Sequence, residues 1–337
     1  PVCEAIGWKY VDLSAEIGLF LLLANDSTLD VESDADCISA CIPFCDSNEN
    51  EPKIPVEQTR VVIARSDTHA GDYTYSPSIT KAGDILYASR DISCRYTEIF
   101  RSDDNGATWR QVGKVDGMWW ATIFENRGDI YLIGRYLKGG MTAKGHSYIG
   151  ISRSTDNGET WSEIREGQGA VDYYGFEPHC APTPVLPLNG RLYRVFESVT
   201  PEKEKRAFVV SADAESDLLL PDSWSISDYF TGYGFPNEGN AVKGPDGKVW
   251  IMSRCVTNKA FLMKLNDDGT IVAALGTNKD SEIDFPSTQA KFTVRFDEKS
   301  GLYIGIANTQ VDINCDGQRN YASLVTSKNL IGSVKLK

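Results

Sequence analysis

The chain has 337 residues, a formal net charge of −13 at neutral pH and 41% hydrophobic residues. This length could hold two average domains, but all-β barrels and propellers of similar length are often single units with one large core. The negative charge argues against nucleic acid or an anionic membrane surface as the main partner, because both attract proteins with basic patches. The most apolar stretch, residues 17–24, has the length of a strand. We therefore expect a soluble chain without a membrane span.

Short apolar strands follow Gly-containing turns at intervals of roughly fifty to sixty residues. The regular copies are GDILY at Gly83, GDIYL at Gly128, NGRLY at Asn189, DGKVW at Asp246 and SGLYI at Ser300, and a looser copy lies at residues 17–26. Such units are typical of the blades of a β-propeller. Helical signals are weak, and the best of them covers only residues 211–219. We predict one all-β domain over residues 1–337, a six-bladed propeller with an irregular, Cys-bearing excursion at about 27–57.

The octet SDDNGATW at residues 102–109 returns as STDNGETW at residues 154–161. Ser, Asp and Gly at these offsets predict a turn in which Asp bonds backbone amides and Gly takes a positive φ. The final Trp is expected to pack between neighbouring blades. Asp104 and Asp156 are therefore interpreted as structural residues.

Both octets resemble the Asp-box, or bacterial neuraminidase repeat, of the sialidase superfamily. The resemblance covers most of residues 75–330 and implies a sialidase-like propeller whose boxes lie on the rim away from the active site. The first arginine of the family's carboxylate-binding triad falls on Tyr75, and we expect Arg90 to serve in substrate binding. The family's catalytic acid has no clean match, and Asp91 and Glu98 are the nearest carboxylates. Other candidates lie in a loop that holds Asp67, His69 and Asp72.

Later segments resemble the family's catalytic strands. NEGNAVKGPDGKVWIMSR at residues 237–254 implies that Glu238 is a base that activates a nucleophile and that Arg254 is the second triad arginine. GQRNYASLVTSKNL at residues 317–330 points to Arg319 as the third. The N-terminal residues 8–26 look like the family's closing blade, which implies Tyr10 as the nucleophile and a ring closed by pairing N-terminal with C-terminal strands. Structural alternatives are inter-blade ion pairs for both arginines and an ordinary core role for Tyr10.

The chemistry fits these residue types. Arginines bind a substrate carboxylate bidentately, and a Tyr with an unperturbed pKa of about 10 needs a neighbouring base such as Glu238. A protonated carboxylic acid would donate to the leaving oxygen. The sequence therefore predicts an exo-acting glycoside hydrolase on a terminal sialic or uronic acid.

A second constellation predicts a different reaction. Glu177 and His179 precede a Pro-rich stretch, and Tyr193 and Glu197 follow the next turn. His179 or His69 with Tyr193 would suit β-elimination at a uronic acid, as in a polysaccharide lyase. A purely structural role for His179 is the alternative.

A third hypothesis is a non-catalytic, glycan-binding propeller, because fold does not determine function. Trp119 and Trp120 lie near Gly in a loop-rich region, as sugar-stacking side chains would. In every case we expect a carboxylate-bearing glycan as the partner, a monomer, and no cofactor.

Eight cysteines suggest an oxidising compartment, and hence a secreted or extracytoplasmic protein with disulfides. Cys37, Cys41 and Cys45 are close in sequence, but their loop has no His and no CxxC spacing. We therefore predict no metal site.

Overall fold

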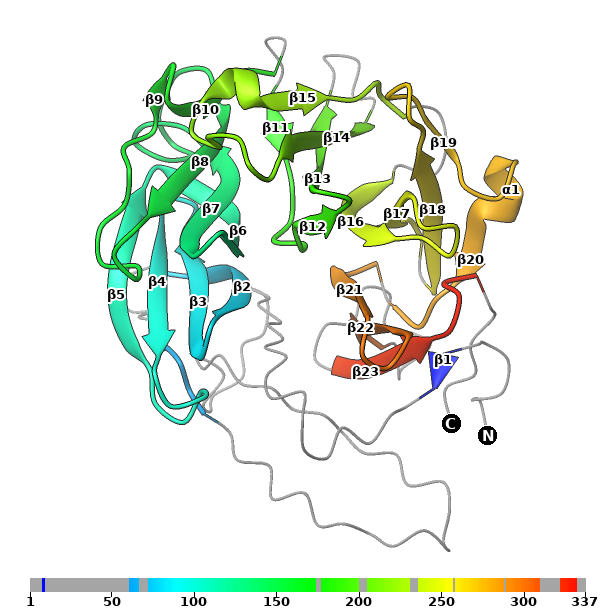
Figure 1. Ribbon diagram of the computed structural model, residues 1–337, viewed down its shortest axis with the longest axis horizontal. Helices are drawn as coiled ribbons and strands as arrows, with labels where there is room; N and C mark the ends of the chain where they lie inside the picture. Colours follow the sequence, from blue (N-terminus) through cyan, green and yellow to red (C-terminus); the bar gives the residue numbers. More distant parts are fainter. Residues whose placement is uncertain are drawn as a thin grey trace, which may run out of the picture.

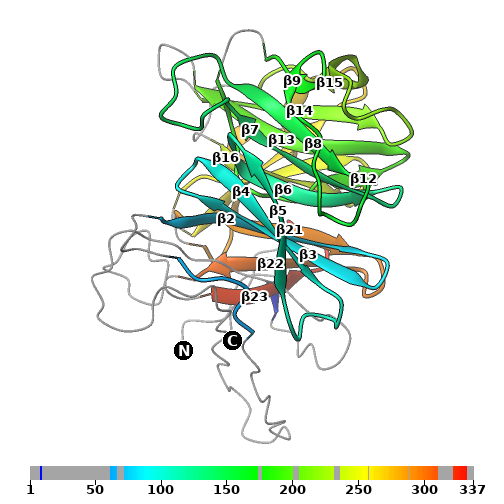
Figure 2. The same ribbon diagram turned by 90° about the vertical axis from the view of Figure 1, so that its left-hand side faces the viewer.

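The computed structural model describes residues 8–9, 61–66, 72–173, 177–199, 205–230, 236–256, 258–287, 289–309 and 322–331. These residues form five β-sheets arranged in a ring (Figure 1). Sheets that follow one another in the sequence are neighbours in the ring, as Figure 2 shows for those of residues 74–116 and 118–171. The chain is therefore an all-β propeller.

The sheets are antiparallel apart from one short parallel pair at the edge of the second. The first contains β2 (Thr74–Ala82), β3 (Ile85–Ile92), β4 (Tyr96–Ser102) and β5 (Arg110–Asp116). The second contains β6 (Met118–Asn126), β7 (Asp129–Tyr136), β8 (Tyr148–Ser154), β9 (Arg165–Glu166) and β10 (Gly169–Val171). The third contains β11 (Pro178–His179), β12 (Leu186–Leu188), β13 (Arg191–Val199), β14 (Lys205–Asp213) and β15 (Trp224–Ile226).

The fourth sheet contains β16 (Asn237–Lys243), β17 (Val249–Arg254), β18 (Lys259–Leu265), β19 (Ile271–Ala273) and β20 (Glu282–Asp284). The fifth contains β21 (Phe292–Asp297), β22 (Leu302–Asn308), β23 (Ala322–Ser327) and β1 (Trp8–Lys9). Helical structure in the described part is limited to the 3₁₀ turn η2 (Pro221–Ser223) and the single turn α1 (Asn278–Ser281). Strands β2, β6, β16 and β21 lie nearest the centre, and in the third sheet β11 and β12 pair with β13 on that side (Figure 1).

Five of the six expected repeats are confirmed as blades. In each sheet the repeated turn joins the two innermost strands, and its glycine has a positive φ at Gly83, Gly128, Gly190, Gly247 and Gly301. The described residues contain five blades; the looser copy at 17–26 lies outside them, as does the expected excursion at 27–57, so the sixth blade stays a prediction. The expected pairing of the N-terminal segment with a C-terminal strand is confirmed, since β1 pairs antiparallel with β23, and the closure of the ring stays a prediction.

Each Asp-box is a hydrogen-bonded turn, as predicted. In the first, Ser102 Oγ donates to Asp104 and accepts the N–H of Gly106, both at 2.8 Å. Asp104 also accepts from the N–H and hydroxyl of Thr108 at 2.8 and 2.6 Å. The second copy repeats these bonds, and in both turns the Thr donors lower the pKa of the Asp to about 2. Ser102 pairs with Leu86, beside the Gly83 turn, so the first box lies at that end of its blade.

The second box also packs against the neighbouring blade. Trp161 bonds Gly158 O through its indole N–H at 2.9 Å and packs on a cluster that includes Tyr87 and Val112 of the first sheet. A Cβ at Gly113 of β5 would lie 2.5 Å from Gly158 O and 2.6 Å from Trp161 Nε1. The predicted packing of this Trp between blades is confirmed.

Four buried side chains, three on the inner strands β2, β6 and β16 and one in the loop between β11 and β12, bond the main chain of the next blade. We call them the interblade belt; they are Ser78, Thr122, Thr183 and Asn240. Thr122 Oγ1 donates to Thr183 O at 2.7 Å, and Thr183 Oγ1 donates to Gly239 O at 2.8 Å. Ser78 Oγ accepts the N–H of Ile123 at 3.1 Å, and the Asn240 amide bonds both Phe292 O and Val294 N at 3.2 and 3.1 Å. The belt therefore runs from the first sheet to the fifth.

Across the described ranges no helix is long and apolar enough to cross a membrane. Three of the eight cysteines, Cys94, Cys180 and Cys255, are within these ranges and carry free thiols. The expected disulfides therefore stay a prediction for the other five.

We expect Gly113→Ala to destabilise the protein by about 1–3 kcal/mol, because its methyl group would overlap the main chain of Gly158. The measurement is the denaturant midpoint of unfolding. Gln111→Ala, an exposed change on the same strand, is the control and should leave the midpoint nearly unchanged. Equal midpoints for Gly113→Ala and Gln111→Ala would contradict the packing of the second box against β5.

Candidate active site

Three inner strands carry a β-bulge close to the end at which the strand begins. The pairing register shifts within β2, β6 and β16. Each bulge contains one non-glycine residue with a positive φ, namely Ser76 at 48°, Trp120 at 53° and Glu238 at 54°. Such backbone is costly, and bulges that re-aim side chains are frequent beside active sites. This end of the ring, opposite the Gly83 turn, is therefore the candidate site.

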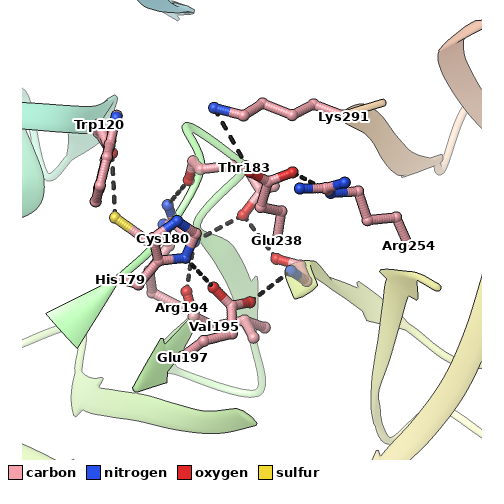
Figure 3. A network of polar contacts seen from close by, with 12 residues as sticks. Trp120, His179, Cys180, Thr183, Arg194, Val195, Glu197, Glu238, Arg254 and Lys291 are labelled. Carbon is pink, nitrogen blue, oxygen red and sulfur yellow. Dashed lines mark hydrogen bonds and ion pairs between the residues drawn. The ribbon is translucent and has the colours of Figure 1, made fainter. Parts of the chain in front are cut away.

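Glu238 lies between two cationic side chains from neighbouring elements (Figure 3). It is 5% exposed; its Oε2 accepts from Arg254 Nε at 2.5 Å, and its Oε1 lies 3.6 Å from Lys291 Nζ. Burial alone would raise the pKa of Glu238, but the charges of Lys291 and Arg254, with a contribution from His179, hold it below its ordinary value. Glu238 is therefore ionised at neutral pH.

The residue after Glu238 must be small. A Cβ at Gly239 would lie 2.7 Å from Val195 Cγ1 and 2.9 Å from Ser253 Oγ. The Gly239 N–H donates to Glu197 Oε1 at 2.9 Å. This close approach joins the bulge of the fourth sheet to β13 of the third.

Glu197 connects that bulge to a histidine. The carboxylate of Glu197 is 1% exposed, and its Oε2 lies 3.2 Å from His179 Nδ1. The imidazole of His179 is 26% exposed and meets the ring of Trp120 edge-on, with centroids 4.7 Å apart. Figure 3 shows Trp120, His179, Glu197 and Glu238 in one network. His179 is therefore held from two sides and open on a third.

A buried arginine supports the loop between β11 and β12. Arg194 is fully buried; its Nη1 donates to Thr183 Oγ1 at 2.7 Å and to Val195 O at 2.6 Å, and its Nη2 donates to Ala181 O. Thr183 belongs to the interblade belt, so this guanidinium couples the loop after His179 to the ring itself.

Arg135 of β7 lies beside the tryptophans. Its guanidinium carbon is 5.2 Å from the ring centroid of Trp119 and 5.8 Å from that of Trp120, and its Nη2 donates to Glu177 at 2.6 Å. Trp119 is fully buried, whereas Glu177 is exposed. Trp119 belongs to the core, and Trp120 is partly buried between it and His179.

Asp91, at the end of β3, is fully buried behind Trp120. One of its oxygens accepts the N–H of Trp120, and the other accepts the hydroxyl of Thr97 at 3.0 Å. Burial raises the pKa of Asp91 to about 7, against the lowering effect of these hydrogen bonds. Its role here is to hold the Trp120 bulge.

The structure brings together five of the expected site residues: Glu238, Arg254, His179, Trp120 and Glu177. Arg90 makes a buried ion pair with Glu98 at 2.9 Å and donates to Thr74 and Arg65 O. Tyr193 pairs with Leu186, four residues along β13 from Glu197, or about 13 Å at the rise of a strand. Tyr10, His69 and Arg319 lie outside the described residues, so their expected roles stay predictions.

Sequence patterns alone did not select three residues of the site. Asp91 is only a nearby carboxylate in the sequence, Glu197 belongs to the second constellation without an assigned role, and Lys291 has no motif around it. The signal for Glu197 was its position opposite His179 on the neighbouring strand, which needs the pairing of β11 with β13 to be known. No three His, Cys, Asp or Glu side chains of the described ranges gather to hold a metal ion.

Asp91 makes stability depend on pH. The folded chain holds a proton on Asp91 up to a pKa of about 7, whereas an unfolded chain releases it near 3.8. The folded state therefore binds more protons between these values, and the contribution of Asp91 to stability decreases as pH rises through this window. We expect Asp91→Asn to raise the melting temperature relative to the wild type more at pH 8 than at pH 4. A difference that is constant across this range would contradict the buried, protonated carboxyl.

No protein-family model matches the chain, and no curated protein matches it in sequence. Solved structures are similar in fold. A Hadza microbial sialidase is 14% identical with a TM-score of 0.57, over 71% of this chain and 54% of that one. Trypanosoma rangeli sialidase in complex with sialic acid is 15% identical with a TM-score of 0.55, over 82% of this chain and 50% of that one.

The chain thus spans about half the length of the sialidases it matches. Identity this low shows the fold alone. The structural similarity to sialidase β-propellers confirms the resemblance expected from the two Asp-boxes.

Proposed function

We propose that the protein is an exo-acting glycoside hydrolase that removes a terminal acidic sugar, a sialic or uronic acid, from a glycan. The observation that carries this proposal is the ionised Glu238 held between Arg254 and Lys291 at the bulged end of a sialidase-like propeller. Similar structures include a sialidase bound to sialic acid. The sheet edges at this end supply the aromatic, cationic and acidic groups that an acidic sugar requires.

Lys291 is the side chain that we propose contacts the substrate carboxylate first. It is 41% exposed and 3.6 Å from Glu238, so an incoming carboxylate can share or take over its ammonium group. Arg254 lies on the other side of Glu238 and completes a positive field around the carboxylate position. We therefore propose that these two cations bind the substrate carboxylate. In the sialidase family that role includes an arginine at the position that Tyr75 occupies here.

Glu238 acts as the base in this proposal. Its ionised form can accept a proton from a nucleophile, either water or a tyrosine such as Tyr10, whose position stays a prediction. Elimination by His179 with Tyr193 has less support, because β13 places Tyr193 away from His179. We also propose a secreted or extracytoplasmic, monomeric protein that needs no cofactor.

The test is to incubate the protein with sialylated and uronic-acid-terminated oligosaccharides while following free sugar and the ultraviolet absorbance of an unsaturated uronate. Release of the acidic sugar without new absorbance is the expected result. A rise in absorbance would establish the lyase instead. Binding of these glycans without turnover would favour the non-catalytic propeller, in which the partly buried Trp120 beside Arg135 is the proposed sugar contact.

Lys291→Ala should raise KM for the acidic substrate about 10- to 100-fold, because it removes one charge-assisted hydrogen bond to the sugar carboxylate. Lys248→Ala, at the far turn where Lys248 pairs with the exposed Asp267, is the matched control. Steady-state kinetics of both variants are measured at equal protein concentration. An unchanged KM in Lys291→Ala would remove this lysine from substrate recognition.

Glu238→Gln should lower kcat about 10²- to 10⁴-fold, the range typical of a lost general base. Isothermal titration with the intact oligosaccharide checks that the variant still binds substrate. If turnover persists near the wild-type rate, Glu238 is a structural partner of Arg254 and not the base.

A further inference from the structure

The proposed hydrolase lacks an assigned proton donor, and Asp91 and His179 are the two titratable groups of the described site that could supply the proton. Asp91 is fully buried, and both of its oxygens already accept hydrogen bonds, from Thr97 and from the N–H of Trp120. No sugar oxygen can reach it without displacing the bulge. The imidazole of His179, at 26% exposed, is the accessible group of the two.

The surroundings of His179 set which ring nitrogen carries the fixed proton. Glu197 Oε1 is occupied by the Gly239 N–H at 2.9 Å, and Oε2 lies 3.2 Å from His179 Nδ1. A buried carboxylate at this distance accepts a hydrogen bond from Nδ1–H and so fixes the tautomer and orientation of the ring. The second nitrogen, Nε2, has no hydrogen-bond partner within the described ranges, so it is the nitrogen that can transfer a proton to a ligand.

The other charged groups near His179 are arranged to match. Glu238 of β16 interacts electrostatically with His179. Lys291, the residue before β21, lies 3.6 Å from Glu238. On the opposite side, Trp120 of β6 covers one edge of the imidazole, and the Arg135–Glu177 pair lies behind that indole. A sugar bound between Lys291 and Trp120 would thus have Glu238 and His179 as its two flanking acid and base groups.

We propose that His179 is the general acid of the site and that Glu197 is its positioning residue; this rests on the hydrolase proposed above. The imidazolium donates its Nε2 proton to the glycosidic oxygen as the bond from that oxygen to the anomeric carbon breaks. The bond's electron pair stays on the leaving oxygen, and Nδ1–H remains bonded to Glu197. Glu238, the base proposed above, takes a proton from the water that adds to the anomeric carbon, and a proton returns from Glu238 to His179 through solvent, so the net change is hydrolysis.

The decisive experiment compares two leaving groups. A natural sialyl oligosaccharide needs a proton on its leaving oxygen, whereas a 4-methylumbelliferyl sialoside has a leaving group that departs without one. We expect His179→Gln to lower kcat/KM about 10²- to 10⁴-fold for the oligosaccharide and far less for the aryl glycoside. His146→Gln is the matched control, because His146 also pairs with a carboxylate, Asp172, at 2.7 Å.

Glu197→Gln is expected to lower activity on the oligosaccharide while preserving the Gly239 bond, since an amide oxygen still accepts it. Its specific signature is the tautomer of His179 in ¹⁵N NMR. The chain has only three histidines, and His146 contacts its carboxylate through Nε2, so the two pairs are distinguishable. The neutral Nδ1–H form of His179 should dominate in the wild type and be lost in Glu197→Gln.

The outcomes separate the two proposals. If the wild type hydrolyses neither these sialosides nor the uronic-acid-terminated oligosaccharides, the hydrolase and the acid role both fail. If it hydrolyses both and His179→Gln reduces them equally, or if the neutral Nε2–H form of His179 dominates, the hydrolase stands and the acid role is wrong. Selective loss of the oligosaccharide reaction supports the acid role.

Discussion

The interblade belt is the constraint on which the rest of the structure depends. A propeller blade buries both faces against its neighbours, so polar atoms of inner strands have no access to water and must be bonded within the ring. Ser78, Thr122, Thr183 and Asn240 meet this demand by bonding the main chain of the following sheet. Each link fixes the position of one blade along the ring axis relative to the next blade. The bulges near the N-terminal ends of β2, β6 and β16 are thereby aligned.

That alignment is what assembles the candidate site from residues far apart in sequence. Glu238 is one residue before the Gly239 carbonyl that Thr183 bonds, and His179 is four residues before Thr183 itself. Glu197 then adds a second tie to the same segment through the Gly239 N–H. The positive φ of Glu238 is therefore maintained by hydrogen bonds to both the N–H and the carbonyl of the next residue, Gly239. Such support is expected where strained backbone persists at a functional site.

Sequence patterns predicted the repeating turns and both Asp-boxes, and the resemblance selected Glu238 and Arg254, because each feature is local or lies on one hairpin. They did not predict the partners of these residues. Glu197 contacts His179 only through the pairing of β11 with β13, and Lys291 reaches Glu238 only through the order of blades around the ring. Arg90 illustrates the converse, since a plausible motif position became a buried ion pair once Glu98 was brought opposite it on β4.

The three buried carboxyl groups of the site, Asp91, Glu197 and Glu238, have different charge and hydrogen-bond partners. Asp91 has no adjacent cation within hydrogen-bonding distance in the described ranges, and burial raises its pKa to about 7. Glu238 is almost as buried, yet Lys291 and Arg254 hold its pKa below the ordinary value. Glu197 is directed at an imidazole. The three groups thus have different roles: Asp91 is neutral and holds a bulge, Glu238 is ionised beside the cations, and Glu197 orients His179. Enzymes likewise obtain acids and bases from residues of one type by giving them different surroundings. The distribution of Arg, Lys and His around them, more than the carboxyl groups themselves, determines which of the three can act on a substrate.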